Sequence, residues 1–117
     1  MVNLTLPYPP SVNTYWGFSG HRRFLTERAT TFKHEVWRIA KQCKAPNLGK
    51  QRLEMTVVLY PPDKRVRDID NVLKPTIDAL CQAHVFDDDS QVDVLFVRRA
   101  EIVKGGKCVV SIEVLPS

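Results

Sequence analysis

Apolar and polar residues alternate along several short stretches of the chain, and this two-residue period predicts β-strands. Residues 2–6 (VNLTL) and residues 53–60 (LEMTVVLY) follow the pattern most closely. Residues 91–103 and 107–115 predict two more strands, joined through the segment KGGK at residues 104–107. Because two adjacent glycines supply the positive φ angles of a tight turn, the last two strands are expected to form a β-hairpin.

Two other stretches place apolar residues three or four positions apart, the period of a helix with one buried face. The first begins after Thr26, a favourable capping residue, and runs to about Lys44. The second begins after Asp70. The expected buried positions are Ala29, Phe32, Val36, Ala40 and Cys43 in the first helix, and Ile69, Val72, Leu73, Ile77, Leu80 and His84 in the second.

The segment before the first helix is less regular. The prolines of PYPPSVN, residues 7–13, cannot donate to a β-ladder, so a loop is expected there. Residues 21–25 (HRRFL) predict a short strand or one arm of a hairpin. The order strand, loop, helix, strand, helix, strand, strand predicts an α/β (α+β) fold in one small domain, residues 1–117, with a mixed β-sheet and two main helices.

Composition agrees with a globular domain, since 44% of the 117 residues are hydrophobic and 26% are charged. No apolar run approaches the roughly 20 residues that span a bilayer. A basic and then apolar leader is also absent from the start of the sequence. We therefore expect an intracellular, cytoplasmic protein that does not bind a membrane.

Cysteine and histidine are sparse and scattered. The residues concerned are Cys43, Cys81 and Cys108, and His21, His34 and His84. An odd number of widely spaced cysteines within apolar patterns predicts buried free thiols, and neither residue type has the spacing of a zinc site.

Charge is distributed unevenly. Residues 1–60 hold nine Lys and Arg against three Glu, whereas residues 61–117 hold eight against ten Asp and Glu. All eight aspartates lie between Asp63 and Asp93. A basic surface facing a focus of acids is typical of a protein that handles a polyanion through a divalent cation, although such asymmetry also occurs without that role.

The motif RDIDN, residues 67–71, places Asp68 and Asp70 at the start of the second helix. If the backbone stays extended through Asp70, both carboxylates project to the same side of the chain. Lys74 then lies one helical turn beyond Asp70 and approaches the same site, and Asn71 and Asp78 share this polar face.

A simpler interpretation assigns these acids to structure. Aspartate is favoured at a helix N-cap, and Asp70 can serve as one. Asp68 would then pair with Arg65 or Arg67. Position 73 is leucine, so the reciprocal capping box is missing, and this interpretation leaves Lys74 without a role.

A second acidic element is the run Asp87, Asp88 and Asp89. Such a run is commonly a solvated turn, and it lacks the ligand spacing of a calcium-binding EF-hand loop. A helix of about ten residues rises about 15 Å, and the residues after it are long enough to return over that distance. Asp89 can therefore approach Asp68 and Asp70 if residues 85–89 fold back along the helix, or if Asp89 comes from another subunit.

Three carboxylates of this kind suit Mg²⁺ or Mn²⁺, with substrate phosphate and water completing the coordination. Such a metal activates water and neutralises charge on a phosphodiester, which points to hydrolysis. Nearby cations that can hold phosphates are Lys64, Arg65, Arg67, Arg22 and Arg23. Tyr15, Trp16 and Phe18 can stack on bases, or instead pack in the core or at an interface.

These motifs together resemble the RusA family of Holliday junction resolvases, Mg²⁺-dependent endonucleases of bacterial and phage origin. The resemblance covers nearly the whole chain. Its four segments are LPYPPSVNTYW (6–16), RDIDNVLKPTIDAL (67–80), DDDSQV (87–92) and the expected terminal hairpin KGGKCVVSIEV (104–114).

The resemblance implies that Asp68, Asp70 and Asp89 hold Mg²⁺ and that Lys74 is a catalytic lysine. Arg67, Asn71 and Asp88 match neighbouring motif positions with supporting roles. Two positions depart from the family pattern: Pro75, which is expected to shift the start of the helix, and Asp87, an additional acid.

The resemblance further implies a homodimer that resolves four-way DNA junctions by paired symmetric nicks, in recombination and repair or in phage DNA processing. Two alternatives remain open at this point. One is a general nuclease of branched or flap DNA that uses the same site. The other is a junction-binding module in which the acids are structural.

Overall fold

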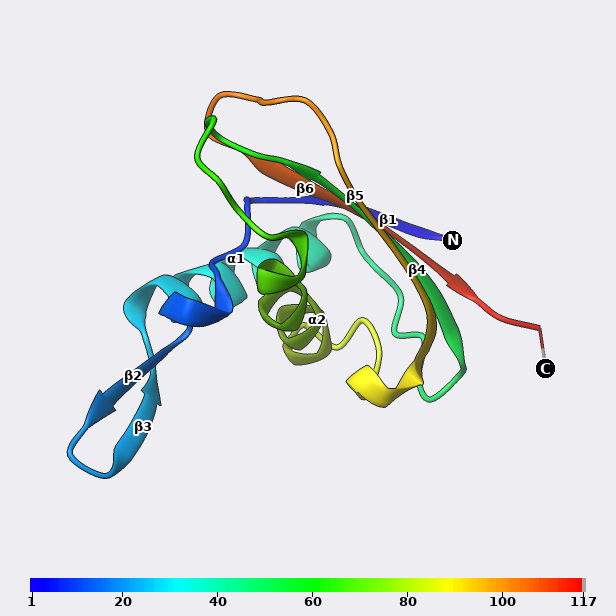
Figure 1. Ribbon diagram of the computed structural model, residues 1–117. Coiled ribbons are helices and arrows are strands. Elements are labelled where there is room, and N and C mark those ends of the chain that lie inside the picture. Colours follow the sequence, from blue (N-terminus) through cyan, green and yellow to red (C-terminus); the bar gives the residue numbers. More distant parts are fainter. Residues whose placement is uncertain (117) are drawn as a thin grey trace.

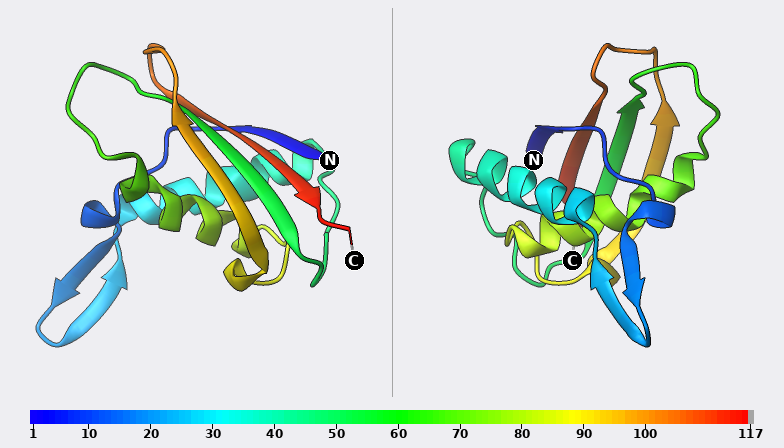
Figure 2. Two further views of the ribbon diagram at one scale, coloured as in Figure 1. Left: turned by 45° about the vertical axis from the view of Figure 1, so that its right-hand side comes forward. Right: turned by 90° about the vertical axis from the view of Figure 1, so that its left-hand side faces the viewer.

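The computed structural model describes residues 1–116 and has a four-stranded mixed sheet with two helices on one of its faces (Figures 1 and 2). The strand order is β1, β6, β4 and β5, with bounds Val2–Leu6, Lys107–Val114, Leu53–Tyr60 and Val92–Arg99. β6 is antiparallel to both β1 and β4, whereas β5 is parallel to β4. The predicted fold class, with its mixed sheet and two main helices, is confirmed.

The central strand β4 follows the predicted alternation over its full length. Leu53, Met55, Val57 and Leu59 are at most 1% exposed, and they pack in one cluster with side chains of both helices. Each fully buried aliphatic side chain of this size stabilises the fold by roughly 1.5–3 kcal/mol. This single core fixes the position of the segments that leave the sheet.

Helix α1, Glu27–Gln42, begins where the sequence predicted. The Thr26 hydroxyl caps it by accepting a hydrogen bond from the Ala29 backbone N–H at 3.3 Å. Four of the five expected buried positions of this helix are buried. Cys43 is the exception: it is exposed, because the helix ends at Gln42 and Lys44 turns the chain with a φ of 53°.

Helix α2, Leu73–Gln82, has the expected length of about ten residues but begins two residues later than Asn71, where it was expected to start. Val72 and Leu80 are buried, but Ile69 is 37% exposed because it precedes the helix in a 3-10 turn, Ile69–Val72. His84 was expected on the buried face and is instead exposed. It lies beyond the helix end with a φ of 63°, in a C-terminal cap where Val85 N–H donates to the Leu80 carbonyl at 3.1 Å.

The prediction that the last two strands form a hairpin is wrong. β4 lies between β5 and β6 in the sheet. The physical reason is the crossover from β4 through α2 to β5, which makes β5 parallel to β4, so β6 pairs with the other edge of β4. Gly106 does have a positive φ, 71°, and a Cβ atom there would lie 2.9 Å from Tyr8 Cβ.

The early arginine-rich segment is a hairpin that projects from the body of the domain (Figure 2). Strand β2, Trp16–Ser19, pairs with β3, Arg22–Leu25, as a separate two-stranded sheet. The expected hairpin arm at residues 21–25 is therefore confirmed. Within residues 1–116, no helix combines the length and apolar character that crossing a membrane requires.

Candidate active site

The two aspartates of RDIDN lie where an extended segment turns into the 3-10 turn before α2. The backbone is extended at Asp68, with φ −86° and ψ 135°, and the turn begins at Ile69. The extended stretch thus ends two residues before Asp70, and Asp70 is inside the turn and not its N-cap. The expectation of an extended chain through Asp70 is wrong, and so is the simple capping role of this residue.

Asp68 occupies the N-cap position of the turn, but its side chain makes no capping hydrogen bond. Both Asp68 and Asp70 are exposed. Arg67 and Arg65 pair with Asp63, at 2.8 Å and 3.8 Å, and not with Asp68. The carboxylates of Asp68 and Asp70 have no ion-pair partner among residues 1–116. Each is therefore available to bind a ligand.

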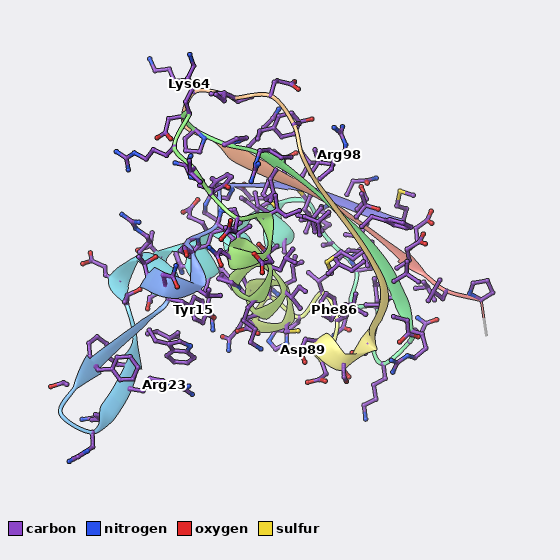
Figure 3. All side chains as sticks on the ribbon, in the orientation of Figure 1. Tyr15, Arg23, Lys64, Phe86, Asp89 and Arg98 are labelled. Carbon is purple, nitrogen blue, oxygen red and sulfur yellow. The ribbon has the colours of Figure 1, made fainter. Side chains whose placement is uncertain are left out.

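Lys74 in the first turn of α2 brings the two acidic elements together. Its Nζ atom lies 3.0 Å from Asp78 Oδ1 and 3.2 Å from Asp89 Oδ2. The hydrogen bonds that Lys74 donates to Asp78 and, to a smaller extent, to Asp89 raise the pKa of Lys74 above its ordinary value. Residues 85–89 therefore fold back along α2 within one chain, which was one of the two routes expected for Asp89. Figure 3 shows Asp89 on the turn that lies beside this helix.

The acidic turn is held by a buried glutamine that the sequence analysis missed. Gln91 is 4% exposed, and its Oε1 atom accepts from the backbone N–H groups of Asp87 at 2.9 Å and Asp88 at 2.7 Å. Its Nε2 atom donates to the carbonyls of Gly49 and Gln51, each at 2.8 Å. Glutamine three residues after an aspartate is the capping-box pattern, so Asp88 and Gln91 did carry a readable signal.

Asp88 supports the turn and is not a partner of Lys74. Its Oδ2 atom accepts from the Ser90 backbone N–H at 3.0 Å and from the Ser90 hydroxyl. The Ser90 hydroxyl is the main reason that the pKa of Asp88 is lowered from its ordinary value. This arrangement leaves Asp89 as the acid of the run that faces α2.

The three predicted metal ligands have suitable donor chemistry but do not form a closed cluster. Exposed carboxylate oxygens are the ligands that Mg²⁺ and Mn²⁺ prefer. Within residues 1–116, however, no three His, Cys, Asp or Glu side chains lie close enough together to hold a metal ion jointly. Asp89 is paired with Lys74, so binding of a cation by all three acids requires their side chains to move closer.

The predicted DNA-binding cations occupy two separate places. Lys64 and Arg65 are exposed in the loop before Asp68, and Arg67 is partly covered, with its guanidinium 5.7 Å from the Tyr8 ring. Arg22 and Arg23 are exposed on the projecting hairpin, and Arg23 is labelled in Figure 3. Asn71 lies in the 3-10 turn between Asp70 and α2.

The early aromatic residues divide between core and surface. Tyr15 is 1% exposed, whereas Phe18 on the hairpin is 72% exposed. Trp16 is partly covered by the Arg23 guanidinium, 3.9 Å from the ring centre. The hairpin thus presents Phe18 and the Arg23–Trp16 pair together.

Comparison with known proteins places the chain in a family of DNA-cutting enzymes. The family model described as Endodeoxyribonuclease RusA matches residues 7–114, so the chain belongs to this family of endodeoxyribonucleases.

Individual relatives agree over almost the whole length. The crossover junction endodeoxyribonuclease rusA of Enterobacteria phage HK97 is 38% identical over 112 residues, which cover 96% of this chain and 93% of the relative. The proteins of the same description from Escherichia coli strain K12 and from Enterobacteria phage 82 are each 31% identical over 105 residues, covering 90% of this chain and 88% of the relative.

Proposed function

We propose that this endodeoxyribonuclease resolves Holliday junctions, four-way DNA branches, by paired symmetric nicks that depend on Mg²⁺, for which Mn²⁺ can substitute. Membership of the RusA family supports the reaction class. The observation that carries the site is the 3.2 Å contact between Lys74 and Asp89, which joins the acidic turn to the helix that follows Asp68 and Asp70.

The proposed roles follow from position and charge. Asp68, Asp70 and Asp89 would hold the cation, which, when bound, activates water and neutralises the scissile phosphate. Lys74 supplies a positive charge to a non-bridging phosphate oxygen as negative charge develops there. Gln91 and Asp88 keep Asp89 directed at α2 through the backbone of the turn.

DNA binding is assigned to the cations around the site. Lys64, Arg65, Arg67 and Asn71 lie on the segment that leads into α2, so they would contact the strand that is cut. Arg22 and Arg23 on the projecting hairpin would contact phosphates further away. Binding through these groups is sequence-independent and weakens as salt is added.

A homodimer would give two equivalent sites related by a two-fold axis. A four-way junction has the matching symmetry, so two copies of the site can nick two strands of the same polarity. The proposed setting is the cytoplasm of a bacterial cell, in recombination, repair or phage DNA processing, because the relatives come from enterobacteria and their phages.

The test is cleavage and binding of a synthetic mobile four-way junction by Asp70→Asn. We expect loss of Mg²⁺-dependent nicking, at least about 100-fold, with the dissociation constant for the junction changed less than about threefold, because only the proposed ligand is removed. Asp93→Asn removes an equal charge from the pair with Arg52 outside the site and serves as the matched control.

Three results would contradict the proposal. Wild-type nicking by Asp70→Asn would remove Asp70 from the metal site. Equal wild-type rates on four-way, Y-shaped and linear duplex DNA would indicate a general nuclease. A wild-type protein that binds junctions without nicking under Mg²⁺ or Mn²⁺ would be a binding module.

A further inference from the structure

Asp78 connects the proposed catalytic lysine to a buried tyrosine. It lies one turn after Lys74 on α2, and its two carboxylate oxygens have different partners. Oδ1 is 3.0 Å from Lys74 Nζ, and Oδ2 accepts a hydrogen bond from the Tyr15 hydroxyl at 3.1 Å. Lys74 in turn contacts Asp89, so four side chains form one continuous polar chain.

Tyr15 is a rigid anchor for this chain. Its side chain is 1% exposed, and its ring meets Trp16 edge-on with 5.2 Å between the ring centres. Its carbonyl accepts from the backbone N–H of Thr26, the cap of α1, at 3.1 Å. Burial, and then the charge of Asp78, raise the pKa of the Tyr15 hydroxyl far above its ordinary value, so it remains a hydrogen-bond donor.

An ordinary surface ion pair does not explain this arrangement. A Lys and an Asp four residues apart on an exposed helix stabilise it only weakly, and they do not need a buried partner from a distant segment. Tyr15 is 63 positions away in the sequence and gives its only polar side-chain group to Asp78. The hydroxyl thereby fixes the rotamer of the carboxylate that faces Lys74.

We propose that Asp78, held by Tyr15, is a positioning residue that keeps the Lys74 ammonium beside Asp89. The side chain of Lys74 is 56% exposed and has many rotamers, so it needs an opposing charge to remain in one place. Asp89 is itself a proposed cation ligand, and its attraction for Lys74 weakens when it binds a cation. Asp78 then retains Lys74 where the scissile phosphate arrives.

The inference rests on the proposed role of Lys74, and one readout is independent of that role. We would measure how fast each lysine of the metal-free protein reacts with an amine-acylating reagent, by mass spectrometry. Asp78→Asn and Tyr15→Phe should raise the reaction rate of Lys74 at least twofold, because a lysine side chain that is no longer held against a fixed carboxylate is more accessible to the reagent. Lys64, exposed and distant from Asp78, is the internal reference, and unchanged labelling of Lys74 in both variants would overturn the proposal.

Cleavage supplies the second readout. In single-turnover assays on a four-way junction, Asp78→Asn should slow nicking about 10–100-fold and Tyr15→Phe by less, with junction affinity within threefold of wild type. Asp78→Glu should recover part of the rate, and Asp93→Asn should behave as wild type. Wild-type nicking by Asp78→Asn, or a loss that appears only in affinity, would overturn the positioning role.

A purely structural role is distinguished by the urea midpoint and by the variant Lys74→Met. Asp78→Asn should unfold at nearly the wild-type urea concentration. If Lys74→Met nicks at the wild-type rate, the assigned role of Lys74 is wrong, and the labelling result still decides whether Asp78 positions its amine.

Discussion

Cys108 on β6 is fully buried, and burial raises the pKa of its thiol from 9.0 to about 12. At a pH between these two pKa values, the unfolded chain loses the thiol proton while the folded protein keeps it. The unfolded state then binds fewer protons, so the free energy of unfolding falls as pH rises through this window. The contribution is fully present below about pH 9 and approaches 1.4 kcal/mol per pH unit inside the window.

We therefore predict that Cys108→Ala flattens the decline of stability at high pH. The variant should be less stable than wild type at pH 8, because a small cavity is left, and the difference should shrink towards pH 10.5. Urea unfolding at several pH values measures both curves. Parallel curves would show that the Cys108 thiol does not titrate as its burial requires.

At the same scale, the motif singled out the acids and the lysine of the proposed site, but it indicated their hydrogen-bond and ion-pair partners only in part. Lys74 was expected near Asp70. Because α2 begins at Leu73, its ion-pair partners are Asp78, one turn further along the helix, and Asp89 on the acidic turn. Asp78 shares a helix face with Lys74 and was visible in the sequence, whereas Tyr15 approaches through tertiary packing that no local pattern encodes.

Among the elements, helices and strands with a regular pattern of apolar and polar residues were predicted closely. The strand pairing that depends on the crossover connection was not. β4 and the start of α1 follow their patterns, since alternation and a threonine cap are local signals. The pairing of β5 was mistaken because two glycines favour a hairpin locally. The path from β4 through α2 determines strand direction instead, and this is a property of the whole connection.

The acidic turn between α2 and β5 gives a prediction at this scale. Gln91→Ala removes four hydrogen bonds, including those to the backbone N–H of Asp88 and the carbonyl of Gln51. The Asp87 N–H and the Gly49 carbonyl keep their 3.1 Å hydrogen bond to each other. We expect a loss of about 2–4 kcal/mol in the free energy of unfolding, measured with urea. Because the turn also carries Asp89, junction cleavage should fall at least tenfold under conditions where the variant remains folded.

Ser90→Ala is the matched control for this turn. Ser90 is exposed, and its hydroxyl bonds only to Asp88, so its removal should cost less than about 1 kcal/mol. If both variants lose stability equally, Gln91 is not what holds the turn. If Gln91→Ala is destabilised but cleaves normally, the turn does not set the position of Asp89.

In the molecule as a whole, a group of basic residues and a group of acidic residues that are separated along the sequence also lie in different parts of the structure. The hairpin that carries Arg22 and Arg23 extends away from the sheet and helices (Figure 1). In the second part of the chain, Asp78 lies on α2, and the acidic turn with Asp89 contacts the start of that helix through Lys74. The sequence predicted both groups of residues. The sequence did not predict that the hairpin projects. Strands β2 and β3 pair only with each other and form no part of the main sheet, and no local sequence pattern shows this.

This shape predicts how salt affects binding. Replacing both Arg22 and Arg23 by alanine should weaken junction binding and reduce the slope of log affinity against log salt by up to about 1.8, since each phosphate contact contributes about 0.9. Fluorescence anisotropy at several salt concentrations measures the slope. Arg38→Ala, on α1 and paired with Glu35, is the control, and an equal effect of that variant would show that the hairpin has no special role.

The proposed homodimer predicts what happens when one of its two sites is inactive. Wild-type subunits mixed with an excess of tagged Asp70→Asn subunits should form mixed dimers that keep junction affinity but can cut only one strand. On a supercoiled plasmid bearing a cruciform, paired nicks within one binding event give linear product, whereas mixed dimers should give nicked circles. The ratio of linear to nicked product should therefore fall as the inactive subunit is added. An unchanged ratio, with subunit exchange verified through the tag, would mean that the two cuts do not come from two subunits of one dimer.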